Sequence, residues 1–102
     1  MAGNAYAGGI ETWFYENSLD GAYLASSVQL SLVRITEARD RGIKASTKLY
    51  VLKNTNMPAI LVECGFMSNK DELKKLTSES YQRLIAYAIS AAIGNYLRGD
   101  KK

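Results

Sequence analysis

The segment 58-PAILVECGFMSNKDE-72 carries an apolar run that ends beside a charged side chain, Glu63. This near-continuous run predicts a central strand over residues 59–66 that is covered on both faces of a sheet. Asn69 then has the position of a helix N-cap, and Glu72 stands three residues further on, as in a capping box. We therefore expect a strand that is followed directly by a short helix.

Two further strands are predicted upstream of this segment. They are 10-IETWFY-15, which is β-branched and aromatic and follows two glycines, and the short run 48-KLYVLKN-54. Alternation in the first of them places Ile10, Thr12 and Phe14 on one face and Glu11, Trp13 and Tyr15 on the other.

Apolar residues that recur every three or four positions predict two long helices, over about residues 18–41 and 78–97. Gly42 stands where the C-cap of the first helix is expected, behind Arg39 and Arg41, whose charges suit a helix C-terminus. The apolar stripe of the first helix consists of Leu24, Val28, Leu32 and Ile35. The expected buried face of the second consists of Tyr81, Leu84, Ile85, Ala88, Ala92 and Tyr96.

The order β, α, β, β, α predicts an α/β fold, with a layered sheet of about three strands and two main helices. The short helix, ending near Leu76, lies between the last strand and the last long helix. The chain has 102 residues, a length that suits one small domain. It has no internal repeat, so we expect a single domain over residues 1–102. The outer edges of so small a sheet are unpaired unless something else covers them, so we expect the chain to be part of something larger.

Composition narrows the classes of function. The formal net charge of +3 fits a solvated surface, with an anionic partner such as DNA or an acidic cell-wall polymer as the other explanation. A single cysteine excludes an internal disulfide, and the absence of histidine removes the commonest metal ligand and general base. No apolar run approaches the ~18 residues of a membrane span. The start, 1-MAGNAYAGG-9, shows no signal peptide.

Glu63 is the strongest candidate for a functional residue. A carboxylate inside a buried strand is costly to desolvate unless it is paired or used, and α/β folds place ligand sites at the carboxyl ends of strands. Desolvation suits such a group to general acid or base catalysis. The other explanation is a structural ion pair with a lysine or an arginine, and the residues alone leave both open.

Other candidates have ordinary structural explanations. Cys64 points to the opposite face and is expected to be a small buried hydrophobe, because no histidine is present to activate it as a nucleophile. Glu11 could line a sugar-binding surface with its aromatic neighbours, although a cross-strand pair with a lysine is favoured. Arg41, Lys44 and Lys48 are expected around a loop, either as a solvated face or in contact with an acidic polymer. Nothing resembles a phosphate-binding glycine loop, a zinc finger or a basic recognition helix, so no nucleic-acid partner is expected.

Taken together, several blocks resemble the second half of the zinc-dependent N-acetylmuramoyl-L-alanine amidases, the family of bacterial autolysins, sporulation amidases and phage endolysins. The similarity covers about residues 4 to 97, and MPAILVECGFMSN is its most specific part. The blocks are 10-IETWFY-15, 24-LASSVQLSL-32, 41-RGIK-44, 51-VLKNTNMPAILVECGFMSNKDELKKL-76 and 81-YQRLIAYAISAAIGNY-96.

The resemblance implies hydrolysis of the amide between N-acetylmuramic acid and the L-alanine of the peptidoglycan stem peptide. It implies a sheet of about six strands, of which this chain is a partial version. It also implies one zinc ion, held by two histidines and a glutamate, and a second glutamate that acts as general base in a VE-x-GF motif. That motif is 62-VECGF-66 here, so the resemblance carries the catalytic role to Glu63.

The sequence departs from the family at the metal ligands. The last ligand in the family is a histidine in an S-x-H-x-N-A segment, whereas 4-NA-5 is preceded here by Met1, Ala2 and Gly3. The chain therefore looks like the C-terminal half of the catalytic domain, expected to bind no zinc by itself and to be inactive alone. Its expected partners are peptidoglycan and the missing N-terminal half, or a second copy through an exposed sheet edge. An extracellular or cell-wall location follows from the substrate of the family, and a non-catalytic fragment for assembly or wall binding is the alternative.

Overall fold

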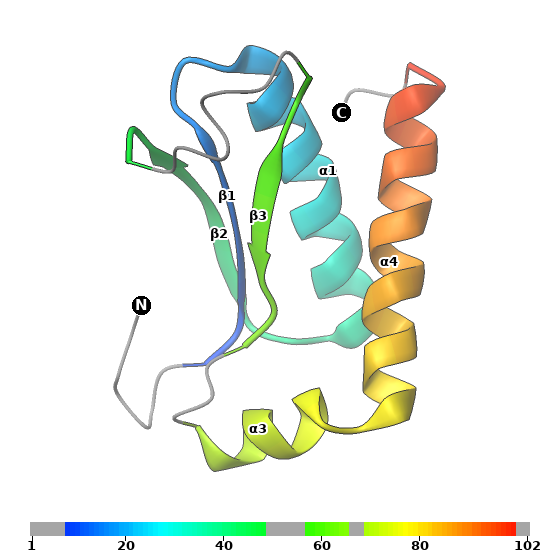
Figure 1. Cartoon of the computed structure of the whole chain (residues 1–102). Helices are drawn as coiled ribbons and strands as arrows, with labels where there is room; N and C mark the ends of the chain where they lie inside the picture. Colours follow the sequence, from blue (N-terminus) through cyan, green and yellow to red (C-terminus); the bar gives the residue numbers. More distant parts are fainter. Residues whose placement is uncertain (1–7, 49–56, 66–68, 100–102) are drawn as a thin grey trace.

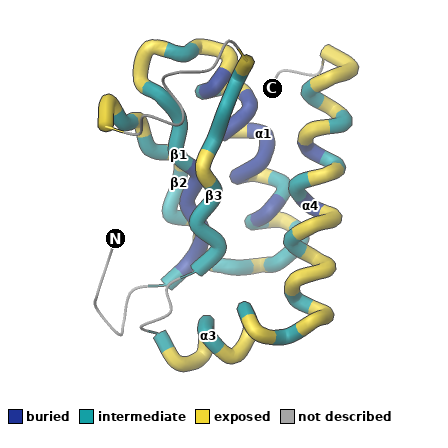
Figure 2. The backbone as a smooth tube through the Cα atoms, viewed as in Figure 1, coloured by how far each residue is buried: buried dark blue, intermediate teal, exposed yellow. Residues whose placement is uncertain are grey.

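A computed structural model describes residues 8–48, 57–65 and 69–99 of the chain. These residues form a mixed sheet of three strands, with two long helices on one side of it and a short helix across one end (Figure 1). Buried residues gather where the sheet meets the first long helix, and the short helix is mostly exposed (Figure 2). The expected α/β layered fold is therefore confirmed for the described residues.

The sheet has the order β2-β1-β3, so the strand β1 (Ile10–Tyr15) occupies its centre. The strand β2 (Asp40–Ser46) runs parallel to β1, and β3 (Ile60–Glu63) runs antiparallel to it. The prediction that the apolar run over 59–66 forms a central strand is wrong for the described sheet, where β3 lies at an edge. Leu61 is 39% exposed, so only one face of β3 is covered.

The strand β2 was not expected from the sequence. Its residues, DRGIKAS, lack the apolar alternation that signals a strand. The predicted strand over 48–54 falls almost entirely on residues 49–56, which lie outside the described residues, and Lys48 itself is not in a strand.

The helix α1 (Leu19–Thr36) begins at Ser18, whose Oγ accepts a hydrogen bond from the amide of Gly21 at 2.8 Å. The predicted continuation to residue 41, with a C-cap at Gly42, is wrong. Glu37 forms the C-cap instead, in the left-handed conformation with φ of 57°, and its amide bonds to the carbonyl of Val33. A non-glycine residue seldom adopts this conformation, so the glycine signal pointed to the wrong position.

Gly42 uses its conformational freedom inside β2. The pairing moves from Ile10–Asp40 to Thr12–Ile43, so β2 has one extra residue opposite Glu11. Gly42 has φ of 81° at this bulge, a conformation that glycine adopts without strain. A glycine at this position is therefore compatible with a helix C-cap and with a strand bulge, and the structure has the bulge.

The core lies between the sheet, α1 and the helix α4 (Glu79–Leu97), which begins at the N-cap Ser78 as expected. Small residues on α4 let the two helices approach closely, and Ser31 Oγ donates a hydrogen bond across them to the carbonyl of Ala88 at 2.7 Å. Leu84 was expected in the buried face but is 43% exposed. The buried apolar cluster consists of Ile10, Leu24, Val28, Leu32, Ala88 and Ala92.

A buried polar network joins α1 to two strands. Gln29 Nε2 donates to the carbonyl of Ile10 at 2.7 Å and to Asp40 Oδ1 at 2.8 Å. Its Oε1 accepts from the hydroxyl of Thr12 at 2.9 Å. Each buried polar group is thereby satisfied, which is the condition for burying it at low cost in free energy.

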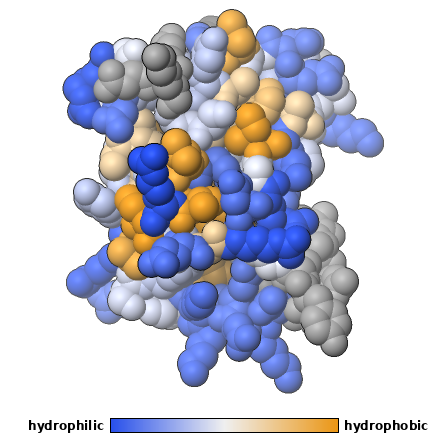
Figure 3. All heavy atoms as spheres, turned by 180° about the vertical axis from the view of Figure 1, so that it is seen from behind, coloured by the Kyte–Doolittle hydropathy of each residue, from blue (hydrophilic) through white to orange (hydrophobic). Residues whose placement is uncertain are grey.

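The helix α3 (Lys70–Leu76) lies at the end of the sheet where β1 begins and β3 ends (Figure 1). Asn69 is its N-cap, as expected, because its Oδ1 accepts from the amides of Asp71 and Glu72 at 3.0 and 3.1 Å. Seen from behind, the surface is hydrophilic at this end, and apolar side chains gather on the side of α1 and α4 (Figure 3). No helix among the described residues is long and apolar enough to cross a membrane.

Candidate functional site

Two glutamates lie side by side on the face of the sheet that α1 and α4 leave uncovered, which we call the helix-free face. Glu63 is the last residue of β3, and the antiparallel register places it directly opposite Glu11 of β1. Trp13 and Leu61 form the next pair of residues on the same face. The other face of these strands, which includes Ile10 and Val62, packs against the helices.

Glu11 is 5% exposed, and other groups bind both of its oxygens. Arg41 Nε donates to Oε1 at 3.1 Å, and Trp13 Nε1 donates to Oε2 at 2.6 Å. The expectation of a cross-strand pair is thus confirmed, but its partner is an arginine of β2 rather than a lysine. The extra residue of the bulge at Gly42 lies in the part of β2 that faces Glu11.

Glu63 is half-buried and differs from Glu11 in its partners. Within the described part of the chain, its Oε1 is shielded from solvent and has no hydrogen-bond partner. The structural ion pair that remained open from the sequence is not formed with any described residue. A buried polar atom without a partner needs an explanation, and a bound substrate, water or ion at this position would supply one.

Cys64 follows directly after β3 and is half-buried. Burial raises the pKa of its thiol, because the thiolate is less well solvated there. A raised thiol pKa opposes the formation of a nucleophilic thiolate, as expected from the lack of an activating histidine.

A third carboxylate reaches this end of the sheet from α3. Glu72 Oε2 accepts a hydrogen bond from the amide of Gly9 at 2.5 Å, between residues that are 63 positions apart in the chain. Gly9 immediately precedes β1, and Arg41 Nη1 donates to the carbonyl of Gly8 at 3.5 Å. The start of β1 is therefore held from two sides.

The basic cluster expected around a loop lies mainly in β2. Arg41 and Lys44 are strand residues, and Lys48 is exposed beyond the end of the strand. Arg41 is engaged with Glu11, so the cluster is not simply a solvated face. A hollow of about 300 Å³ is lined by Arg39, Asp40, Arg41 and Lys44.

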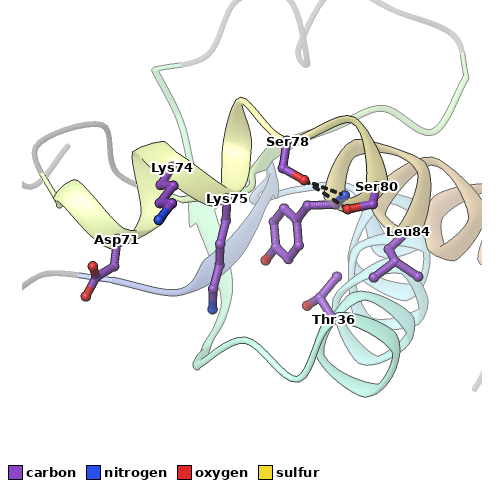
Figure 4. A pocket seen from close by; sticks show the side chains of 8 residues that line it. Thr36, Asp71, Lys74, Lys75, Ser78, Ser80 and Leu84 are labelled. Carbon is purple, nitrogen blue, oxygen red and sulfur yellow. Dashed lines mark hydrogen bonds between the residues drawn. The ribbon is translucent and has the colours of Figure 1, made fainter.

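A hollow of about 640 Å³ is lined by neither Glu11 nor Glu63. Asp71 and Lys74 of α3 stand at one end of it, and Thr36 and Leu84 stand at the other (Figure 4). Its remaining lining residues are Lys75, Ser78, Ser80 and Tyr81. Glu72 is not among its lining residues.

The residues present do not fit a zinc site. The chain contains no histidine, and no group of three or more possible ligands comes together among the described residues. Glu11 and Glu63 are neighbours, but Arg41 and Trp13 already bind Glu11. A tetrahedral site with nitrogen or sulfur ligands cannot be built from these groups.

The sequence indicated Glu63 and Glu11 as candidates but not the contacts that Arg41 and Glu72 make at this end of the sheet. Arg41 was assigned to a helix end and to a basic cluster around a loop, because the bulge in β2 gives no apolar pattern. Glu72 was assigned only to a capping box, and no local signal indicates its bond to Gly9. Two glycines, at positions 8 and 65, were the available hint that another group approaches the backbone closely.

The chain is similar to known proteins over most of its length. Residues 1–95 match the N-acetylmuramoyl-L-alanine amidase family. The chain is 38% identical over 91% of its length to an uncharacterised cell wall amidase of Bacillus anthracis, of which it spans 19%. It is 42% identical over 90% of its length to the N-acetylmuramoyl-L-alanine amidase of Clostridium difficile 630, with a TM-score of 0.85 and 50% of that chain covered. It is 36% identical over 93% of its length to the CwlD amidase of Clostridioides difficile, solved in complex with the GerS lipoprotein, with a TM-score of 0.89 and 49% of that chain covered.

Proposed function

Because this chain belongs to the N-acetylmuramoyl-L-alanine amidase family, we propose that it supplies one half of a peptidoglycan-hydrolysing domain. The reaction cleaves the amide between the lactyl group of N-acetylmuramic acid and the L-alanine of the stem peptide. The observation that carries the proposal is Glu63, a carboxylate at the end of β3 whose Oε1 is shielded and has no partner in the described part of the chain.

In this proposal Glu63 is the general base. Its carboxylate takes a proton from water as the water oxygen attacks the amide carbonyl carbon. The carbon–nitrogen bond then breaks, and the same proton passes to the departing nitrogen of L-alanine. The products are the free lactyl carboxyl group and a new amino terminus, and a positioned base of this kind contributes about 10²–10⁴-fold to the rate.

The proposal requires a second half. We infer that the zinc implied by the family resemblance would be held by that second half, since this chain has no histidine and no group of three possible ligands gathers among its described residues. Support comes from the two solved relatives, of which the chain spans about half, at 50% and 49%. We assign the docking of that half to the helix-free face and to the adjoining strand edge.

The place of action follows from the substrate. Peptidoglycan lies outside the cytoplasmic membrane, and the B. anthracis relative is a cell wall amidase. We therefore propose that the assembled domain acts in the cell wall or the extracellular space.

The test measures the release of new L-alanine amino termini from purified peptidoglycan. The 102-residue chain is assayed with zinc, alone and after coexpression with the first half of a related amidase domain. We expect no release by the chain alone, release by the coexpressed pair, and a loss of about 10²–10⁴-fold with Glu63→Gln. A coexpressed pair that carries Asp71→Asn serves as the control, because Asp71 lines a hollow that neither Glu11 nor Glu63 lines.

Two outcomes would overturn parts of this proposal. Release by the chain alone would show that it needs no second half. A pair that assembles but releases nothing would favour the alternative, a non-catalytic fragment for assembly or wall binding, and a pull-down with insoluble peptidoglycan would then measure that activity directly.

A further inference from the structure

Glu72 of α3 has an unusual position between two strand ends. Its Oε2 accepts the amide hydrogen of Gly9, at the entry to β1, at 2.5 Å. A charged acceptor makes such a bond stronger than a bond between neutral groups. The capping box expected from the sequence is a local role, whereas this bond joins α3 to the central strand of the sheet.

The two oxygens of Glu72 each lie against a different glycine. A Cβ atom added to Gly8 would lie 3.0 Å from Oε2, and one added to Gly65 would lie 3.0 Å from Oε1. Neither glycine has a backbone conformation that demands glycine, so the reason for these residues is space. The carboxylate thus fills a gap between the entry to β1 and the exit from β3.

These strand ends are the ones that hold the proposed catalytic base. Gly65 follows Glu63 by two residues, and Glu63 pairs with Glu11, which follows Gly9 by two residues. A shift of either strand end therefore moves the pair of glutamates directly. The N-cap of Asn69 fixes the first turn of α3 and with it the direction of the Glu72 side chain.

We propose that Glu72 is a positioning residue, whose carboxylate joins the ends of β1 and β3 and so sets where Glu63 stands on the helix-free face. The inference rests on the proposed function for its catalytic consequence, but its structural part can be tested on the 102-residue chain alone. Asp71 provides a matched control, because it carries a carboxylate on the same helix turn but lines a hollow to which Glu72 does not contribute.

The first measurement is amide hydrogen exchange at Gly9, together with the carboxyl carbon resonance of Glu63, both by NMR. We expect Glu72→Ala to speed exchange at Gly9 by about tenfold or more, the loss of one charge-assisted hydrogen bond. The Glu63 resonance should move as well. Glu72→Gln keeps a carbonyl oxygen that can accept from Gly9, so it should restore much of the protection, and Asp71→Asn should change neither signal.

A second variant covers the case in which Glu72→Ala fails to fold. Gly65→Ala leaves Glu72 in the sequence but crowds its Oε1, so it should also move the Glu63 resonance. Unchanged exchange at Gly9 in Glu72→Ala would overturn the proposal. Faster exchange with an unmoved Glu63 resonance would also overturn it, because Glu72 would then only anchor β1.

The kinetic consequence is measured on the coexpressed pair that hydrolyses peptidoglycan. Glu72→Ala should lower kcat with little change in KM, because the base is misplaced while substrate contacts remain. An unchanged kcat would contradict the positioning role. A wild-type pair without activity would contradict the proposed function instead, and the NMR result would still decide whether Glu72 positions Glu63.

Discussion

The two faces of the sheet differ in how their polar groups find partners. On the face covered by α1 and α4, the buried Thr12 and Gln29 are hydrogen-bonded to each other, and Gln29 also donates a hydrogen bond to the backbone carbonyl of Ile10. On the helix-free face, Glu11 is satisfied by Arg41 and Trp13, but the adjacent Glu63 has a shielded oxygen with no described partner. Residues that alternate along the same strands therefore lie in two very different environments.

The two faces therefore have different roles, one in the stability of the fold and the other in contacts with a partner or substrate. The helix-covered face closes a core with groups from this chain, so its side chains determine whether the chain folds. The helix-free face carries the half-buried Glu63, the side chain of Trp13 and the exposed Leu61, a combination that suits contact with a partner or substrate. Substitutions on the two faces should consequently have different effects.

The largest expected effect is in the core. Leu32→Ala removes a fully buried side chain and should lower the free energy of unfolding by about 2–5 kcal/mol. Leu61→Ala makes the same chemical change on the helix-free face and should lower it by about 1 kcal/mol or less. Urea denaturation followed by circular dichroism measures both, and equal losses would show that the two faces do not differ in this way.

The next effect concerns the polar network of the covered face. Gln29→Ala leaves the hydroxyl of Thr12 and the carbonyl of Ile10 without their partner and should lower the free energy of unfolding by about 1–3 kcal/mol. Gln82→Ala is the control, since Gln82 donates to the carbonyl of Leu76 at an exposed position. A loss no larger than that of the control would mean that water replaces Gln29 without cost.

A smaller effect is expected for the ion pair of the helix-free face. Arg41→Met leaves Glu11 with only the hydrogen bond from Trp13 and should lower the free energy of unfolding by about 1–2 kcal/mol, because Arg41 is itself 26% exposed. The exposed ion pair between Arg83 and Glu79 is the reference. Arg83→Met should lower the free energy of unfolding by about 0.5 kcal/mol or less. Thermal unfolding at low and moderate salt compares the two, and identical values would contradict the role of burial.

The smallest effect concerns Cys64. Burial raises the pKa of its thiol in the folded chain, so the folded chain retains the proton to a higher pH than the unfolded chain. Its contribution to stability is therefore complete below the thiol pKa of the unfolded chain and is lost as pH rises through the folded value. Urea midpoints should decline more steeply at alkaline pH in the wild type than in Cys64→Ala, and parallel curves would show that Cys64 contributes nothing.

Sequence patterns gave the parts of the fold that depend on local periodicity and capping. The stripe of α1, the cap at Asn69 and the start of α4 follow from such patterns and are confirmed. The strand β2 could not be predicted, because its residues lack apolar alternation and its bulge interrupts the regular pairing with β1. The end of α1 could not be predicted either, because Glu37 adopts a conformation usually reserved for glycine.

The site shows the same division. Glu63 could be identified because a charge interrupts an apolar run, and Glu11 because it shares a strand with aromatic residues. Arg41 contacts Glu11 across 30 positions of the chain and Glu72 contacts Gly9 across 63, and both contacts are made only in the folded state. A lysine was expected beside Glu11, but the partner is Arg41. Arg41 was not considered for this role because the first helix was expected to continue to residue 41.

Trp13 gives the most direct measurement of the central claim, that the helix-free face is where the rest of the amidase domain docks. It is the sole tryptophan of the chain and lies on that face. Its fluorescence should shift to the blue, and its quenching by acrylamide should fall, as a tryptophan-free first half of a related domain is added up to an equimolar amount. Unchanged emission and quenching in a mixture that hydrolyses peptidoglycan would contradict the claim, because the second half would then be docked elsewhere.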